Sequence, residues 1–265
     1  MANLGTFDEG SVLYEHRGPI TVITISRPEV RNAVDEPTAA ALFRAFELFE
    51  DDDDARVAVL TGAGETFCAG ADLRALSQGR ENRVRDDGPG PMGPTRMVLA
   101  KPVIAAVEGY AVAGGMELAL WCDLRVAARN AVFGVFNRRW GVPLVDGGTF
   151  RLPRIVGMGR AMELILTGRP MSAEEAYQAG LVNAVTEPGQ ALDAAVQLAT
   201  RIARFPQTTL NCDRLAAYEA SMLPTEDAIR VESRWGMKAL ASGEALEGAR
   251  RFARGAGRHG NFEDI

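Results

Sequence analysis

Cysteine and histidine are scarce in this chain. The three cysteines are widely spaced and include no Cys-x-x-Cys pair; they are Cys68, Cys122 and Cys212. This pattern argues against a disulfide framework and against a zinc site, so no metal is expected. It fits a reducing compartment, and we expect a cytoplasmic protein. The two histidines, His16 and His259, fall outside every motif described below, and neither is a catalytic candidate.

Long apolar runs are lacking as well. No stretch of about 18 uncharged apolar residues is present, so no membrane-spanning helix is expected. The longest candidate, residues 103–128, is interrupted by Glu108, Glu117, Asp123 and Arg125. The first ten residues carry two acidic side chains and no apolar stretch, which argues against a signal peptide. The formal net charge of −6 gives no support to a nucleic-acid partner, and it disfavours an RNA-binding role.

The chain does contain an ordinary globular composition, with 47% hydrophobic and 24% charged residues among 265. Two β-rich runs, 11–16 and 20–26, flank Arg17-Gly18-Pro19 and predict a hairpin. Apolar residues at helical spacing predict a helix over 35–50. Further short apolar strands are expected at 56–60, 101–107 and 124–128. Strands that alternate with helical or glycine-rich segments indicate an α/β fold with crossover connections.

Two regions depart from this alternation. From about residue 153 the pattern is almost wholly helical, most clearly at 191–203 and 228–240, so a strand-rich front precedes a helical tail. Residues 79–94 mix three arginines with acidic residues, glycine and proline, and they predict a mobile loop without regular structure. This loop is either a plain connection or a lid whose arginines meet a phosphate-bearing ligand.

Two segments of small residues are candidates for close backbone contact with a ligand. In residues 66–73, small side chains precede a helix expected to begin at Asp72. In residues 109–120, a strand ends in a glycine-rich turn that opens a helix, whose first N–H groups lack helical partners. The spacing of a dinucleotide-binding loop is absent, and no Gly-Lys-Ser/Thr follows that would make a phosphate-binding P-loop.

Glu117 stands in the first turns of that second helix. Its neighbours at helical spacing, including Leu120 and Trp121, are apolar. A carboxylate on an apolar face is costly unless it is paired or useful, and burial would raise its pKa into the range of proton transfer. The functional interpretation is a general acid/base; the structural one is a partner of the helix dipole or an ion pair.

Several ordered motifs together resemble the enoyl-CoA hydratase/isomerase (crotonase) family over nearly the whole chain. They are Ser26-Arg-Pro with Asn32-Ala, Phe67-Cys-Ala-Gly-Ala-Asp, residues 101–111, Gly114-Gly-Met-Glu-Leu-Ala, Cys122-Asp, Phe133-Gly, Gly147-Gly-Thr-Phe-Arg-Leu, Leu166-Thr-Gly and residues 173–181. The resemblance implies an α/β fold, the crotonase (ClpP-like) spiral of ββα units with a helical C-terminal region. It implies a core domain over 1–195, a helical trimerisation or lid region over 196–265, and a homotrimer or homohexamer.

The resemblance also implies an acyl-CoA substrate. The backbone N–H groups of Ala71 and Gly114 are expected to form an oxyanion hole, which agrees with the two segments of small residues and would stabilise a thioester enolate. Because coenzyme A is part of the substrate, no separate cofactor is expected. The coenzyme A moiety is expected to contact Glu29, Val30, Arg31 and the Ala69 carbonyl group. The remaining expected substrate-binding residues are Gly70, Asp72, Leu73, Gly115, Trp140 and Phe252.

Phe252 and the side chains of the acyl pocket leave alternatives open. Phe252 and the Asn261-Phe262 pair resemble the family's C-terminal region, where Phe252 either touches coenzyme A or serves as a core or interface aromatic. The length of the acyl group is expected to depend on pocket residues that include Met92, Met97, Phe136 and Trp140.

The chain departs from the family at one catalytic position. Hydratases of the family carry a second glutamate twenty positions after the first, and here that position is Asn137, with the spacing to Gly141 and Gly147 kept. Asparagine can hold a water molecule but cannot exchange a proton. One missing acid/base group typically costs about 10²–10⁴ in rate. Isomerisation of a double bond needs only one base, so it is less affected.

Asp146 is a possible substitute. It lies in the loop where some family isomerases carry a catalytic aspartate, one residue out of register. The structural alternative is an N-cap for the helix after Gly147. Arg138 and Arg139 either pair with Asp146 or line the acyl pocket.

The sequence therefore predicts an acyl-CoA enzyme that acts through an enolate. Its expected catalytic groups are Glu117, Ala71, Gly114, Asn137 and Asp146. An enoyl-CoA hydratase is expected first and an enoyl-CoA isomerase second. A protein that binds acyl-CoA without turnover is the alternative from another class.

Overall fold

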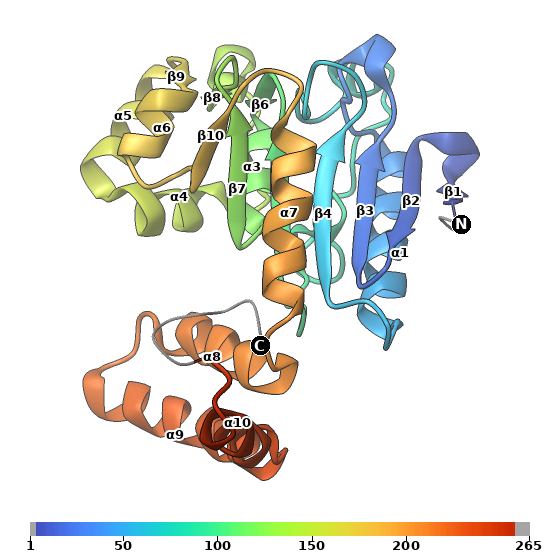
Figure 1. Ribbon diagram of the computed structural model, residues 1–265. Helices are drawn as coiled ribbons and strands as arrows, with labels where there is room; N and C mark the ends of the chain where they lie inside the picture. The colour runs from blue at the N-terminus through green and yellow to red at the C-terminus, as the bar shows by residue number, and fades with distance from the viewer. Residues whose placement is uncertain (1–3, 258–265) are drawn as a thin grey trace. The chain divides into compact units, whose positions relative to one another are not determined.

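The computed structural model describes residues 4–257 (Figure 1). The chain divides into two compact units, Met1–Ala199 and Thr200–Ile265. The boundary expected at 195/196 falls inside helix α7, Ala191–Ala203, and the roles of the two regions stay a prediction. Across residues 4–257, no helix is both long and apolar enough to pass through a membrane. His259 and the Asn261-Phe262 pair lie outside the described residues.

The first unit is built on two sheets. The strands are β1 (Leu4–Phe7), β2 (Val12–Arg17), β3 (Ile20–Ile25), β4 (Val57–Gly62), β5 (Val103–Val107), β6 (Tyr110–Val112), β7 (Leu124–Ala128), β8 (Val132–Gly134), β9 (Met171–Ser172) and β10 (Ala184–Thr186). The larger sheet has the order β1-β2-β3-β4-β5-β7-β10, and the smaller one has the order β6-β8-β9. In the larger sheet β1, β2 and β3 pair antiparallel, while β3, β4, β5, β7 and β10 run parallel.

The helices of the first unit follow the strands in turn. They are α1 (Glu36–Asp51), α2 (Leu73–Ser77), α3 (Gly114–Trp121), α4 (Gly148–Val156), α5 (Met158–Thr167), α6 (Ala173–Gln178) and α7. Short 3₁₀ turns lie at Asp8–Gly10, Pro28–Val30, Pro94–Arg96 and Phe136–Trp140. The expected hairpin is confirmed as β2 and β3, and the helix expected over 35–50 is confirmed as α1, with the Asp35 side chain accepting from the Thr38 N–H at its N-cap.

The repeating unit is a long strand, a short strand and a helix. β5 leads through β6 into α3, and β7 leads through β8 towards α4. In the two earlier repeats of the spiral, isolated β-bridges take the place of the short strand. Val34 pairs with Ala71 before α1 and α2, and Cys68 pairs with Ala111 of β6. The spiral of ββα units is therefore confirmed, and its short strands all precede helix N-termini.

The central parallel strands β3, β4, β5 and β7 are buried on both faces, as is usual for parallel sheets. On one face, Ile23, Leu60 and Ala105 belong to the cluster that includes Phe46 of α1 and Leu118 of α3. Residues that alternate with these, such as Val22, Val59 and Ile104, are equally buried on the other face. Helix α7 crosses in front of the sheet in Figure 1 and has Ala191, Ala195 and Ala199 buried at a spacing of four.

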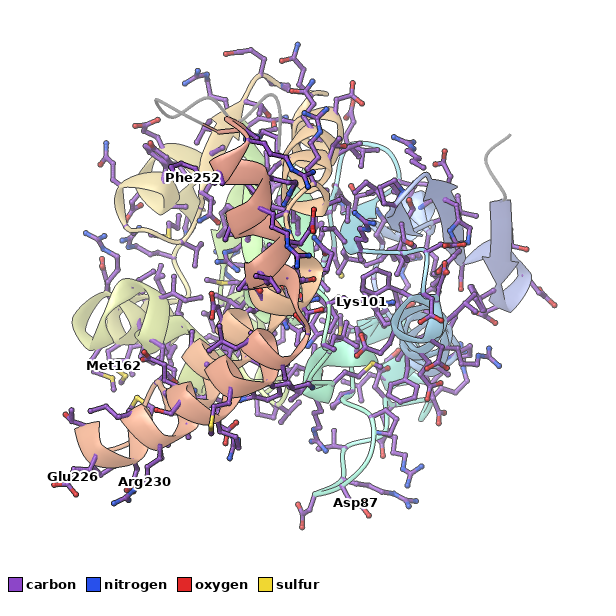
Figure 2. The ribbon with its side chains drawn as sticks, turned by 60° about the horizontal axis from the view of Figure 1, so that its bottom comes forward. Asp87, Lys101, Met162, Glu226, Arg230 and Phe252 are labelled. Atoms are coloured by element: carbon purple, nitrogen blue, oxygen red, sulfur yellow. The ribbon has the colours of Figure 1, made fainter. Side chains whose placement is uncertain are left out.

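The structure corrects the expectation for the segment after residue 153 and agrees with the irregular loop expected after residue 79. The segment after residue 153 is not wholly helical, because β9 and β10 occur there and β10 completes the edge of the large sheet beside β7. Strands of two and three residues are too short to show an alternating pattern. Residues 79–93 contain no helix or strand, which confirms the irregular loop, and Figure 2 shows Asp87 on a part of it that projects from the surface. The mobility of this loop stays a prediction.

The second unit consists of α8 (Gln207–Ala220), α9 (Thr225–Ala241) and α10 (Glu244–Ala253) after the end of α7. Glu244 ties α10 to α8, because its carboxylate accepts from the Thr208 and Thr209 N–H groups at 2.9 and 2.7 Å. Glu219 of α8 accepts from Trp235 Nε1 of α9. Phe252 of α10 is 62% exposed, so the interpretation as a core aromatic is wrong (Figure 2).

Candidate active site

The segment that carries Ala71 is positioned by the bridge to Val34. The Val34 N–H donates to the Gly70 carbonyl at 2.8 Å, and the Asp72 N–H donates to the Val34 carbonyl at 3.0 Å. Successive peptide groups in extended chain point to opposite sides. The N–H of Ala71 therefore points away from Val34, to the side on which α3 begins.

Gly114 meets this segment at the N-terminus of α3. A Cβ atom built on Gly70 would lie 2.9 Å from the Gly114 nitrogen, and Gly70 has a φ of +96° that favours glycine. Ala113 turns the chain into α3 with a positive φ of 52°, which is unusual for a residue with a Cβ. Within residues 4–257, neither the Ala71 nor the Gly114 N–H donates to a protein acceptor. Two residues with free N–H donors thus line the same cavity, and their role as the oxyanion hole stays a prediction.

Asp72 supports this arrangement. Its Oδ1 accepts from the N–H groups of Arg74 and Ala75 and so caps α2, while its Oδ2 lies 3.2 Å from the Arg27 guanidinium. The same guanidinium lies 3.0 Å from the Asp35 carboxylate. The carboxylate of Asp72 is thereby occupied within the protein, although the residue borders the cavity described below. This geometry gives Asp72 a positioning role, and its expected contact with substrate stays a prediction.

Glu117 is buried to 2% exposure on α3 and is one of the residues that line the cavity. Its Oε1 accepts from the N–H groups of Asp146 and Gly148, at 3.0 and 2.8 Å. A Cβ on Gly148 would lie 3.0 Å from this oxygen, a tight contact that would push the carboxyl group aside by a few tenths of an ångström. Burial raises the pKa of Glu117 to about 7, against the lowering effect of the Gly148 N–H. At neutral pH the group can therefore either take or give a proton.

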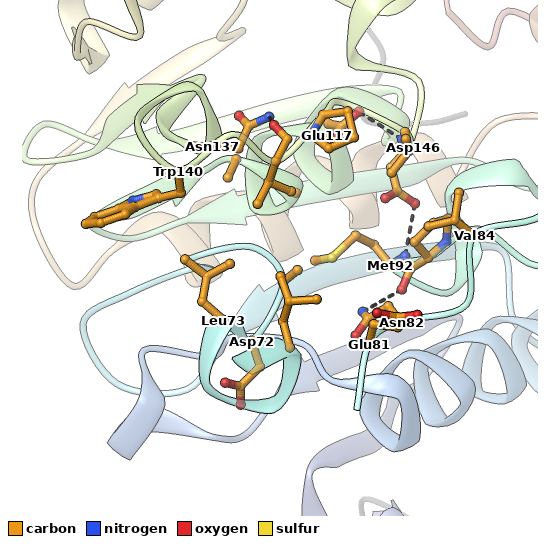
Figure 3. A pocket seen from close by; sticks show the side chains of 18 of the residues that line it. Asp72, Leu73, Glu81, Asn82, Val84, Met92, Glu117, Asn137, Trp140 and Asp146 are labelled. Carbon is orange, nitrogen blue, oxygen red and sulfur yellow. Dashed lines mark hydrogen bonds between the residues drawn. The ribbon is translucent and has the colours of Figure 1, made fainter. Parts of the chain in front are cut away.

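Asp146 lies beside Glu117 in the same cavity wall (Figure 3). Its Oδ1 accepts from the Met92 N–H at 2.9 Å and from the Thr95 hydroxyl. Burial raises the pKa of Asp146 above its usual range, while the bond from Thr95 opposes this. Arg151 fixes the surrounding backbone, because it donates to the carbonyl groups of Asp146 and Thr95, both at 2.8 Å.

The two structural alternatives for Asp146, an N-cap of the next helix and an ion pair with Arg138 or Arg139, are wrong. Gly147, not Asp146, is the N-cap residue of α4, and no side chain caps that helix. Arg138 donates to the Ile165 carbonyl, and Arg139 donates to the Gly168 carbonyl and lies over the Phe136 ring. The buried Asp146 carboxylate is held instead by backbone and hydroxyl donors from residues 92–95.

Asn137 is buried beside the cavity in the turn Phe136–Trp140. The side-chain Nδ2 of Asn137 donates to the Val142 carbonyl at 2.8 Å. The Val142 N–H donates in return to the main-chain carbonyl of Asn137 at 3.3 Å. Its side-chain oxygen is enclosed and has no partner among the described residues. The amide is thus committed to holding the turn, and it contributes no titratable group to the cavity.

These residues surround one cavity of about 730 Å³, a volume typical of small-molecule sites. Figure 3 shows Glu117 and Asp146 on the opposite side of it from Leu73 and Asp72. The lining includes Ala69, Ala71, Asp72, Leu73, Gly114, Glu117, Asn137, Trp140 and Asp146 from the expected site, together with Met92 and Phe136 from the expected acyl pocket.

Other expected residues lie elsewhere. Glu29 and Val30 fall in the turn Pro28–Val30, and neither they nor Arg31, Gly70, Gly115 and Met97 are part of the cavity lining. Gly115 instead packs against the Cys68 carbonyl, where a Cβ would lie 2.1 Å away, and Met97 offers its carbonyl group to Trp121 Nε1. Phe252 belongs to the second unit. Their contacts with substrate stay predictions, and Met97 does not line the cavity as an acyl-pocket residue was expected to.

Sequence reasoning missed Thr95, which bonds the Asp146 carboxylate, and Arg151, which holds the loop. Residues 81–84 line the cavity, which agrees with the alternative that the 79–94 loop meets the ligand, while a lid movement and a phosphate contact stay predictions. Arg151 belongs to a motif that was recognised, so its position in Gly147-Gly-Thr-Phe-Arg could have suggested a role. Nothing local marks Thr95, which is brought to Asp146 across 51 residues of chain.

The chain is similar in sequence to known proteins. The family model described as enoyl-CoA hydratase/isomerase matches residues 15–258. The enoyl-CoA hydratase EchA19 of Mycobacterium tuberculosis is 36% identical over 94% of this chain and 96% of its own length. A carnitinyl-CoA dehydratase of Salmonella paratyphi A is 40% identical over 89% of this chain and 92% of its own length.

Solved structures agree with these relatives. The enoyl-CoA hydratase EchA1 from Mycobacterium marinum superposes with a TM-score of 0.87 and 40% identity, covering 92% of this chain and 96% of that one. A carnitinyl-CoA dehydratase from Mycobacterium avium gives 0.75 and 40%, covering 91% and 96%. The chain therefore belongs to the enoyl-CoA hydratase/isomerase family, has its crotonase fold, and is an enzyme of the type that acts on acyl-CoA thioesters.

Proposed function

We propose that the protein is an acyl-CoA lyase that adds water across the double bond of a 2-enoyl-CoA or removes it in reverse. The observation that carries this proposal is the buried Glu117, whose pKa is raised to about 7, in one cavity with two free N–H donors. The names of the similar proteins support a lyase, because hydration and dehydration are the two directions of one reaction.

The proposed reaction uses a single carboxyl group for both proton transfers. The thioester oxygen accepts hydrogen bonds from the Ala71 and Gly114 N–H groups. Water adds its oxygen to Cβ while the Glu117 carboxylate takes its proton, and negative charge moves to the thioester oxygen. The two N–H groups stabilise that enolate. Glu117 then returns the proton to Cα, so that one H and one OH have been added and the enzyme is restored.

A second candidate is a double-bond isomerase, favoured by the specific position of Asp146. Asp146 lines the same cavity next to Glu117, and burial raises the pKa of its carboxyl group as well. Position 137, in contrast, carries an amide bound to Val142. Two neighbouring carboxyl groups could move a proton from Cγ to Cα through the same enolate, without water.

The two candidates are separated by turnover of 2-enoyl-CoA and 3-enoyl-CoA substrates of equal chain length. A lyase hydrates the 2-enoyl-CoA, and Glu117→Gln lowers its kcat about 10²–10⁴-fold. Its kcat/KM rises with pH towards about 7 and then levels off, because Glu117 must be ionised to accept the proton of water. In an isomerase, Asp146→Asn abolishes conversion of the 3-enoyl-CoA.

A protein that binds acyl-CoA without turnover would show neither activity, no exchange of solvent deuterium at Cα, and no change in thioester affinity with Glu117→Gln. Equal hydration rates for the parent protein and Glu117→Gln would contradict the lyase proposal.

A further inference from the structure

The inner surface of the cavity is largely hydrocarbon. Its walls include Leu73, Leu76, Met92, Phe136, Val142 and Val145. A methylene group is about the size of a water molecule, about 30 Å³, so a four-carbon acyl group fills about 120 Å³. The cavity of about 730 Å³ leaves room for a much longer chain, even with part of it taken by the arm that carries the thioester.

The charged groups of the lining do not offer a partner for a charged acyl group. Asp72 is paired with Arg27, and Glu117 and Asp146 are held by backbone and hydroxyl donors in the reacting part of the site. Among the described lining residues, the remaining charged side chains are Glu81 and Arg83, which are exposed and of opposite sign on the 79–93 loop. A carboxylate deep in the cavity would thus meet two buried carboxyl groups and no buried cation.

The aromatic lining does not form a cage for a quaternary ammonium group either. Such groups are recognised by the open faces of several aromatic rings. Here the Phe136 ring already carries the Arg139 guanidinium, 4.0 Å from its centroid. Trp140 is 69% exposed. A trimethylammonium group would lose water without gaining equivalent contacts.

We infer that the enzyme takes an uncharged hydrocarbon acyl group of about eight carbons or more, in preference to a four-carbon or a charged one. Met92 helps to accommodate it, because its flexible thioether lies against Gly114, where a Cβ would come within 2.7 Å of the sulfur. The preferred class of acyl group follows from the cavity lining. Only the chemistry at the thioester end rests on the proposed function.

Binding of saturated thioesters tests the inference independently of turnover. Affinities are measured for butyryl-, octanoyl- and dodecanoyl-CoA, together with octanoyl-CoA bearing a terminal carboxylate. Each fully buried methylene contributes about fourfold in affinity, so octanoyl-CoA should bind at least about 10-fold more tightly than butyryl-CoA. The terminal carboxylate should cancel this gain. The same order is expected for kcat/KM of the 2-enoyl-CoAs, with 4-trimethylammonio-2-butenoyl-CoA the poorest.

A matched pair of tryptophan variants places the effect in the cavity. Leu76 borders it at 40% exposure, and Leu48 on α1 is 48% exposed and outside its lining. Leu76→Trp should weaken dodecanoyl-CoA at least fivefold with little change for butyryl-CoA, whereas Leu48→Trp should change neither. Affinity that is flat or falls with chain length, or equal binding of the carboxylate, would overturn the inference even if hydration is observed. Length-dependent binding without turnover would instead refute the proposed function and leave this inference standing.

Discussion

At the scale of single residues, Glu117 links the site to the stability of the protein. Its folded-state pKa of about 7 lies above the ordinary value of 4.5. The folded chain therefore holds this proton more tightly than the unfolded chain does. The resulting stabilisation is fully present below pH 4.5 and is lost as the pH rises through about 7. At about 1.4 kcal/mol per pKa unit, the loss amounts to about 3 kcal/mol.

Glu117→Gln should remove this dependence, because the amide oxygen can still accept from the Asp146 and Gly148 N–H groups without titrating. Relative to the parent protein, we expect the variant to gain about 3 kcal/mol in unfolding free energy between about pH 4.5 and about pH 8. Urea unfolding at both pH values measures it. Glu47→Gln, which changes an exposed glutamate on α1, serves as the control. A parallel pH dependence in the parent protein and in the Glu117→Gln variant would contradict the assignment of this proton.

The sequence predicted which residues form the site better than it predicted the hydrogen bonds that hold their side chains. The family resemblance implied that Ala71, Gly114 and Glu117 act at one site, and all three line one cavity. It also located the asparagine that replaces the second glutamate. It did not reveal that the Asn137 amide bonds to Val142, or that Thr95 rather than an arginine holds the Asp146 side chain. Such bonds depend on loop conformations that no local propensity encodes.

At the scale of elements, α2 has only five residues, and its position depends on Asp72. This side chain caps the helix and joins Arg27, immediately next to the Ala71 N–H. Asn is as good an N-cap as Asp, whereas Ala is not, and losing a cap costs about 1 kcal/mol. The two substitutions therefore separate the cap from the ion pair.

We expect Asp72→Asn to retain the helix and most of the activity, since Arg27 keeps Asp35 as a partner. Asp72→Ala should destabilise the protein by about 2 kcal/mol and lower kcat more than it raises KM, because the Ala71 donor is displaced from the thioester oxygen. Thermal unfolding and steady-state kinetics on a 2-enoyl-CoA measure both. Equal kcat values in the two variants would show that the cap does not position the donor.

Helices and strands were predicted correctly where the pattern of apolar residues extended over enough positions. Helix α1 and strands β2 to β5 occur where the apolar spacing indicated. Prediction failed for β10, whose three residues join the sheet because β7 leaves an unpaired edge beside them. That edge is a property of the assembled sheet, and the local sequence contains no trace of it.

At the scale of the whole molecule, α9 and α10 leave large apolar side chains in water. Met237 and Leu240 of α9 are 65% and 68% exposed, and Leu246 and Phe252 of α10 are 58% and 62% exposed. Residues 237 and 240 lie on one face of α9, as a spacing of three requires. Neighbouring exposed apolar side chains such as Met237 and Leu240 are typical of protein interfaces. A self-association surface on α9 is therefore expected, and the trimer or hexamer expected from the resemblance stays a prediction.

We therefore expect the 28.5 kDa chain to sediment as a particle of about 86 or 171 kDa, three or six copies. The double variant Met237→Lys and Leu240→Lys should shift this mass towards the monomer, because burying two charges in an interface is unfavourable. Glu47→Lys places a lysine at an exposed position of α1, outside the second unit, and should leave the mass unchanged. Analytical ultracentrifugation across a range of protein concentrations distinguishes these outcomes. A monomeric parent protein, or an assembly that the double variant leaves intact, would show that this face of α9 is not where the copies meet.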